Sequence, residues 1–268
     1  MRSEQYASQS RQATRRGRMG FLYRATSALF LTSFRAFDVR IDVRGAENIP
    51  ATGGAILASN HISYLDFAFV MLSSPAPRRD VRFLARSEFF NVPIVGQVLR
   101  GLRQIPVDID GDPLTAAAEA RSALENGELV GMHPEGTISP SFVMRRAKSG
   151  AVRLAEQANV PLIPVGLWAP QRLLTKGVPF RPQRHVSVLV EYGEPFYPSG
   201  RTGAAKTVEL MDRIGALLAS AQQRYPQQPT PTNNWWQPAH LGGTAPTPEE
   251  AETLLAVQFS KRRRSGTN

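Results

Sequence analysis

Short apolar segments alternate with helix-like segments from residue 38 onward, and this alternation limits the possible folds more than any other feature. Strands are predicted at 38–44, 54–59, 81–85, 104–108, 128–132, 162–167 and 186–192. Helices are predicted at 64–72, 93–102, 113–126 and 148–158, and a last amphipathic helix carries Val208, Met211, Ile214, Leu217 and Leu218. Strands that alternate with helices predict an α/β layer fold rather than a helical bundle or a sandwich.

Composition narrows the classes of site and partner. The chain has 268 residues, 42% of them hydrophobic, which suits one medium-sized domain with appendages. It has no cysteine, which excludes a disulfide framework, a thiolate metal site and a cysteine nucleophile. The net charge of +10 predicts an anionic partner, either nucleic acid or anionic lipid headgroups. No nucleic-acid recognition motif is present, so we expect no nucleic-acid partner.

The N-terminal region divides into a basic segment and an apolar one. Residues 1–18 are rich in arginine and are expected to be disordered. Residues 19–37 are apolar and aromatic, but Arg24 and Arg35 interrupt them, so the uncharged stretch is shorter than the ~20 residues of a membrane span. No small-residue cleavage motif of a signal peptide follows immediately. The pattern predicts an amphipathic helix at a membrane interface, or alternatively a helix that packs on its own domain.

The C-terminal region differs in amino-acid composition from the main domain, which we place at 38–225. Residues 226–268 are rich in Pro, Gln and Thr, end in a basic run, and are predicted to be largely irregular. Trp235 and Trp236 are the exceptions. They dock this tail on the domain or lie at a lipid interface, and the sequence does not separate these alternatives.

A histidine and an aspartate follow the predicted buried strand at 54–59. The segment reads Asn60-His61-Ile62-Ser63-Tyr64-Leu65-Asp66. His61 lies at the carboxyl end of that strand, where α/β folds open their clefts. Asp66 lies in the first turn of the next helix, and its carboxylate can orient one ring nitrogen so that the other acts as a base. Alternatively, Ser63 and Asp66 form only a capping-box helix start.

A second polar segment follows the predicted strand at 128–132. It reads His133-Pro134-Glu135-Gly136-Thr137, a tight turn that would hold Glu135 forward into the same cleft. Lys148-Ser149-Gly150-Ala151 then opens a helix, and Val160-Pro161-Leu162-Ile163-Pro164-Val165 leads into another strand.

These segments resemble motifs I, III and IV of the PlsC-type acyltransferases, in the same order, within the region from about residue 38 to residue 195. The resemblance implies a mixed, mostly parallel sheet flanked by helices, with 38–225 as the catalytic domain. It implies an acyl thioester donor, either acyl-CoA or acyl carrier protein, and no metal or redox cofactor. His61 would be the general base and Asp66 its orienting partner. Residues implied on the substrate-binding side are Asn60, Ser63, Glu135, Gly136 and Thr137.

Two positions depart from the family pattern. Ile109 and Ile138 stand where the family usually has arginines, one of which is linked to the acceptor phosphate. Isoleucine makes no charge-assisted hydrogen bond to a phosphate. Other cations would then have to bind the acceptor, and the candidates are Arg103, Arg145, Arg146 and Lys148.

The function implied by the resemblance is acylation of lysophosphatidate to phosphatidate in phospholipid biosynthesis. The form of motif III and the stretch from Trp168 to Gly177 look like a bacterial branch that is commonly assigned this activity. The expected location is the cytoplasmic face of the cell membrane, as a peripheral protein. Because the two arginines are absent, acylation of another lipid hydroxyl, in a glycolipid or a phosphatidylinositol mannoside, is the alternative. A lipid-binding protein of the same fold without activity is a further one.

Overall fold

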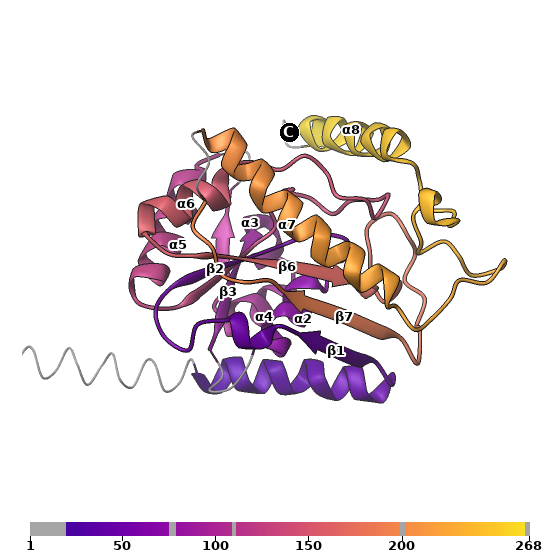
Figure 1. Ribbon diagram of the computed structural model, residues 1–268, viewed down its shortest axis with the longest axis horizontal. Helices are drawn as coiled ribbons and strands as arrows, with labels where there is room; N and C mark the ends of the chain where they lie inside the picture. The colour runs from indigo at the N-terminus through magenta and orange to yellow at the C-terminus, as the bar shows by residue number, and fades with distance from the viewer. Residues whose placement is uncertain (1–19, 75–78, 109–110, 199–201, 266–268) are drawn as a thin grey trace, which may run out of the picture.

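The computed structural model describes residues 20–74, 79–108, 111–198 and 202–265. Its centre is a seven-stranded sheet in the order β1-β7-β6-β2-β5-β3-β4 (Figure 1). The strands are β1 (Arg40–Arg44), β2 (Ala55–Ser59), β3 (Val81–Arg86), β4 (Ile105–Val107), β5 (Leu129–Met132), β6 (Leu162–Trp168) and β7 (Ser187–Tyr192). Paired neighbours are parallel except β6 and β7, which are antiparallel. The expected mixed, mostly parallel sheet is confirmed.

Helices cover both faces of this sheet (Figure 1). They are α2 (Asp66–Ser73), α3 (Ser87–Phe90), α4 (Val95–Gly101), α5 (Pro113–Glu125), α6 (Gly150–Ala158), α7 (Gly203–Gln223) and α8 (Pro248–Ser265), with an unlabelled helix over residues 20–36. The helices α5, α6 and α7 share one apolar cluster with Ile56 and Ala58 of β2. The helix over 20–36 and α2 share another with Ala55 and Leu57. Successive side chains of a strand point to opposite faces, so a strand covered on both faces is apolar throughout.

The strand register brings two loops together at one edge of the sheet. β2 lies between β5 and β6. Ala58 of β2 is opposite Met132 of β5, and Ser59 of β2 is opposite Val165 of β6. The chain leaves β2 and β5 at the same carboxyl edge because these strands are parallel. The segments that begin at Asn60 and His133 therefore start side by side.

The helix over 20–36 packs on the domain with one face and exposes apolar side chains on the other. Tyr23 and Phe34 are buried; the Tyr23 hydroxyl accepts the Val81 N–H at 3.1 Å, and Phe34 stacks on Phe69 at 4.6 Å between ring centroids. The alternative that this helix packs on its own domain is thus confirmed for that face. The opposite face exposes Phe21 (69%), Leu22 (48%) and Leu29 (60%). None of the helices in the described ranges is long and apolar enough to span a membrane.

The C-terminal region is more ordered than its composition predicts. The prediction of a largely irregular tail is wrong over α8, which begins with a reciprocal capping box. The Glu250 N–H donates to the Thr247 hydroxyl at 3.3 Å, the Thr247 N–H donates to the Glu250 carboxylate at 2.9 Å, and Pro248 takes the first helical position. Trp236 is 1% exposed and packs on Trp168 and Tyr225 in a buried cluster, so this tryptophan docks the tail on the domain. The segment predicted to be disordered, 1–18, lies outside the described residues.

Candidate active site

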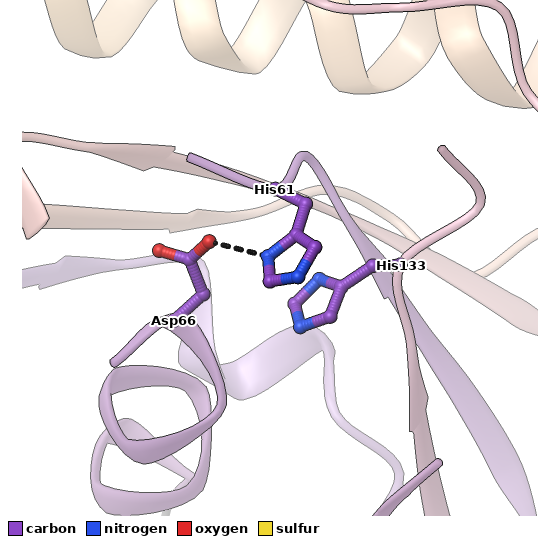
Figure 2. Close-up of side chains that lie close together, drawn as sticks. All are labelled: His61, Asp66 and His133. Atoms are coloured by element: carbon purple, nitrogen blue, oxygen red, sulfur yellow. Dashed lines mark hydrogen bonds and ion pairs between the residues drawn. The ribbon is translucent and has the colours of Figure 1, made fainter. Parts of the chain in front are cut away.

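His61 and Asp66 form a hydrogen-bonded pair at the carboxyl edge of β2. The His61 Nδ1 lies 2.9 Å from Asp66 Oδ2, which also accepts the N–H groups of Ile62 at 2.7 Å and Ser63 at 2.9 Å (Figure 2). Asp66 is completely buried, whereas the His61 side chain is 19% exposed. A carboxylate on Nδ1 holds the proton there and leaves Nε2 with a free lone pair, as a general base requires. Asp66 therefore both orients the imidazole and fixes the loop before α2.

Glu135 holds the backbone of the histidine loop in place. Its Oε1 accepts the His61 N–H at 2.8 Å, and its Oε2 accepts the Arg145 N–H at 2.9 Å. Glu135 is only 4% exposed. The His61 carbonyl in turn accepts the Ser139 N–H at 2.9 Å. The sequence correctly predicted that Glu135 lies beside His61. Both carboxylate oxygens accept backbone N–H groups, so Glu135 shapes the site by holding the backbone of His61 and Arg145.

Asn60 and Ser63, expected on the substrate-binding side, are buried positioning residues. The Asn60 amide donates to the Leu167 carbonyl at 3.0 Å and accepts the Leu167 N–H at 2.8 Å, which ties the loop to β6. The Ser63 hydroxyl donates to the Leu174 carbonyl at 2.6 Å. Both residues are 0% exposed. The expectation that they contact substrate is wrong, because both residues are buried and their polar groups form hydrogen bonds that fix the loop carrying His61.

Gly136 and Thr137 form the turn next to this loop. Gly136 has φ +72°, a conformation that favours glycine, and it is exposed. A Cβ atom there would lie 3.7 Å from the side chain of Lys148. The Thr137 hydroxyl accepts a hydrogen bond from Lys176 Nζ at 3.3 Å. The turn therefore lies near the side chains of two lysines, Lys148 and Lys176.

His133 is a component of the site that the sequence reasoning did not single out. Its ring lies parallel to that of His61, with an interplanar angle of 2° and 3.9 Å between centroids (Figure 2). Its Nδ1 lies 2.9 Å from the hydroxyl of Ser59, the last residue of β2. Its place directly after β5, next to the strand that delivers His61, was the available signal.

Comparisons with known proteins agree with this geometry. Residues 40–168 match a family model described as Acyltransferase. A 1-acyl-sn-glycerol-3-phosphate acyltransferase of Bacillus subtilis is 27% identical over 187 residues, which cover 66% of this chain and 87% of that protein. The crystal structure of a 1-acyl-sn-glycerophosphate acyltransferase, PlsC, from Thermotoga maritima has the same fold, with a TM-score of 0.67 and 23% identity over 80% of this chain and 85% of that chain. Residues 40–168 are thus similar to acyltransferases, and the fold of the chain is that of the PlsC structure.

Other relatives match the chain over only part of their own length. An uncharacterised protein of Mycobacterium leprae is 28% identical over 238 residues, and the match spans 73% of this chain but only 62% of that protein. A mouse 1-acyl-sn-glycerol-3-phosphate acyltransferase alpha is 32% identical over 151 residues, 55% of this chain and 52% of that protein. The chain therefore spans only about half to two thirds of the length of these two relatives.

Of the two isoleucines that stand where the PlsC-type pattern usually has arginines, the structure describes only Ile138. Ile138 is 4% exposed, so this position offers an apolar side chain to the interior. Ile109 lies outside the described residues.

The proposed replacement cations lie in different places. Arg103 precedes β4 and pairs with Glu128 at 2.7 Å, at the amino ends of the parallel strands β3, β4 and β5. It lies at the sheet edge opposite His61, so the structure contradicts a role for Arg103 at this site. The Arg145 guanidinium makes bonds of 2.8 and 3.0 Å to Glu252 of α8. Arg146 and Lys148 are exposed.

Burial shifts the pKa values of three titratable groups in the site, and each shift favours the neutral form. Burial, and to a lesser degree the Lys176 ammonium, lower the pKa of His61 from its ordinary value to about 3. Burial likewise lowers the pKa of His133 to about 3, and the neighbouring His61 adds to that effect. Burial raises the pKa of Glu135, although the N–H groups that it accepts oppose the rise. His61 is therefore unprotonated near neutral pH and available as a base.

The site also contains the residue types of a metal centre. Ligand atoms of His61, Asp66 and His133 all lie within 4.8 Å of one another. The two imidazole rings are stacked and parallel, so no single cation can lie in the plane of both rings at coordination distance, as His–metal bonds require. This arrangement fits a base and its neighbours better than a metal centre.

Proposed function

We propose that the chain transfers a fatty acyl group from acyl-CoA or acyl carrier protein to the free hydroxyl of lysophosphatidate, forming phosphatidate in phospholipid biosynthesis. The observation that carries this proposal is the His61–Asp66 pair, bonded at 2.9 Å through Nδ1, with His61 partly exposed at the edge of the sheet. The similarity to the 1-acyl-sn-glycerol-3-phosphate acyltransferases of Bacillus subtilis and mouse supports the same acceptor.

The reaction follows from the proton positions. The His61 Nε2 takes the proton of the acceptor hydroxyl while the oxygen attacks the thioester carbonyl. The tetrahedral intermediate then collapses, the carbon–sulfur bond breaks, and the thiolate takes the proton from His61. Asp66 keeps the first proton on Nδ1 and stabilises the imidazolium. Neither metal nor redox cofactor is needed for these steps.

Acylation of another lipid hydroxyl is the second candidate function. Its support is the apolar Ile138 at a position where the family usually carries an arginine, since that side chain provides no charge for a phosphate. Purified protein, radiolabelled palmitoyl-CoA and a panel of lysolipids, separated by thin-layer chromatography, would identify the acceptor. The proposal expects labelled phosphatidate as the main product. Labelled product from an uncharged glycolipid, with none from lysophosphatidate, would favour the second candidate.

We further propose that the chain works as a peripheral protein at the cytoplasmic face of the cell membrane. The helix over 20–36 exposes Phe21, Leu22 and Leu29 on one face, with its arginines beside them. Exposed apolar side chains next to basic ones favour an anionic lipid interface.

Changing Phe21, Leu22 and Leu29 together to serine should shift the protein from the membrane fraction to the soluble fraction. The fold should persist, because these side chains point away from the domain. Flotation with anionic vesicles measures the effect, and binding by the unchanged protein should weaken as salt rises. The matched control is Leu114→Ser with Val208→Ser, since these residues are exposed on helices of the other face, at 75% and 59%. An unchanged membrane fraction in the triple variant would show that another surface anchors the protein.

The pH dependence of the reaction should reflect the lowered pKa of His61. A base with a lowered pKa stays unprotonated to lower pH, so kcat/KM should remain level below pH 6.5, the ordinary pKa of histidine, before it falls. A pH–rate profile with saturating donor measures this. A fall in kcat/KM already centred at or above the ordinary histidine pKa would contradict the buried geometry of His61.

A further inference from the structure

The Asp66 carboxylate holds one edge of the His61 ring, but a bond to one edge does not fix the plane of the ring. The carboxylate lies 2.9 Å from Nδ1. The torsion between Cβ and an imidazole ring has a broad energy minimum, so the ring can still turn about that bond. The lone pair of Nε2 lies in the ring plane, and it takes a proton from a hydroxyl within hydrogen-bonding reach in that plane. A second contact is therefore needed to set the direction in which His61 acts.

The His133 ring provides such a contact, because it lies flat against the ring of His61. The two planes differ by 2°, and the ring centroids are 3.9 Å apart (Figure 2). At this distance the faces are in van der Waals contact, so a tilt of the His61 ring would push its atoms into His133. Burial lowers the pKa of His133 to about 3. The stacked ring is therefore neutral, and it adds no positive charge beside the imidazolium that forms on His61.

His133 is in turn held by residues of the strands on both sides of β5. The hydroxyl of Ser59, the last residue of β2, lies 2.9 Å from His133 Nδ1 and is completely buried. The ring of Phe83 in β3 packs against His133 with 5.2 Å between centroids. Gly131 of β5 leaves room for that ring, since a Cβ atom there would overlap it. Three neighbouring strands thus fix the position of His133, and sites built on strands are more precise than sites on loops.

We propose that His133 is a positioning residue for the general base, whose ring sets the plane of the His61 imidazole and so the direction in which Nε2 takes the acceptor proton. Asp66 selects the tautomer of His61, and the stacked ring selects its plane. The flat ring carries this role, and the bond from Nδ1 to Ser59 anchors it. The inference rests on the proposed function in that it takes His61 as the base, but it assumes nothing about the headgroup of the acceptor.

The test separates the ring of His133 from its hydrogen bond. Ser59→Ala with His133→Phe keeps a flat ring and leaves no hydroxyl of residue 59 unpaired. Ser59→Ala with His133→Leu is its matched partner, with an aliphatic side chain in place of the ring. His133→Asn keeps a polar atom near the position of Nδ1 for Ser59 but removes the ring. His240→Asn is the control for the same change at an exposed histidine.

The kcat and KM values are measured with palmitoyl-CoA and lysophosphatidate, and thermal unfolding shows whether each variant is folded. The variant with Phe should keep kcat within about twofold of the unchanged protein. The variants with Leu and with Asn should lose roughly 5- to 50-fold in kcat, because a misaligned base slows the chemical step. KM for both substrates should stay within about twofold, and His240→Asn should behave as the unchanged protein.

Equal kcat values for the Phe and Leu variants would overturn the role of the ring. A loss with Phe as large as that with Asn would overturn it too, since the nitrogen atoms of His133 would then be what matters. A raised KM with unchanged kcat would show that His133 contacts substrate instead. The Phe–Leu pair and the Asn variant are independent arms, so either one decides if the other does not fold.

These outcomes leave phosphatidate formation by the unchanged protein intact. If the unchanged protein acylates only another lysolipid, the proposed acceptor is wrong and the same variants are compared with that lysolipid. If it acylates none, the proposed function is overturned, and the inference with it.

Discussion

His61→Ala should lower the rate of acyl transfer by about 10²–10⁴-fold while the protein stays folded. Without the imidazole, no group of the pair takes the proton from the acceptor hydroxyl, and the attacking oxygen must lose it to water. The bonds that shape the loop remain, because the His61 N–H to Glu135 and the His61 carbonyl to Ser139 N–H involve only its backbone. Initial rates with labelled palmitoyl-CoA and lysophosphatidate measure the loss.

His240→Ala is the matched control, because His240 is an exposed histidine of the C-terminal region. Circular dichroism and thermal unfolding should show both variants to be as folded as the unchanged protein. Near-normal turnover by His61→Ala would mean that another group is the base.

Asp66→Asn should lower the rate by about 10²-fold or more, although the side chain keeps its size. The carboxylate accepts three N–H groups on Oδ2, those of the His61 ring, Ile62 and Ser63. An amide group can donate to His61 Nδ1 and so stabilise the tautomer with the proton on Nε2, which cannot act as a base. The loss should appear in kcat, since the tautomer affects the chemical step rather than binding.

The control for this variant is Asp212→Asn, the same chemical change at an exposed position of α7. Because Asp66 is buried and bonded to backbone amides, its variant is also checked by thermal unfolding. A folded Asp66→Asn protein with unchanged kcat would show that Asp66 serves only the helix start.

The fold was largely predictable because its strands and helices leave strong local patterns. The continuous apolar run at Ala55–Ser59 indicated a strand covered on both faces, and the structure places it at the centre of the sheet. Asp112 and Pro113 predicted a helix start that the structure shows, with the Asp112 carboxylate accepting the Leu114 N–H. α8 was missed because composition outweighed its capping box, Thr247-Pro248-Glu249-Glu250.

The site was predictable only where its residues lie close in sequence or in one motif. The pairing of His61 with Asp66 follows from their spacing after a strand. Asn60 and Ser63 were misassigned because their partners, the backbone groups of Leu167 and Leu174, come from β6 and the segment after it. Such long-range bonds leave no periodic signal.

The sequence contains Lys176 and His133 in recognised stretches, but their positions at the site were not predicted, for related reasons. His133 stands inside a recognised motif, but its stacking on His61 depends on the register of β2 with β5. Lys176 is brought to Thr137 by the segment after β6, so neither spacing nor hydropathy marks it. The positions of both residues depend on how separate strands lie side by side in the sheet, which the sequence alone does not show.

Release of donor thiol with and without lysophosphatidate tests most directly whether His61 drives direct transfer to the acceptor. The chain has no cysteine, so a thiol reagent reports only the thiol of the donor. We expect thiol release only when the acceptor is present, in equal amount to the phosphatidate formed, and almost none with His61→Ala. A burst of thiol equal to the enzyme without acceptor would show a covalent acyl-enzyme, and acceptor-dependent release that persists in His61→Ala would show that His61 is not the base.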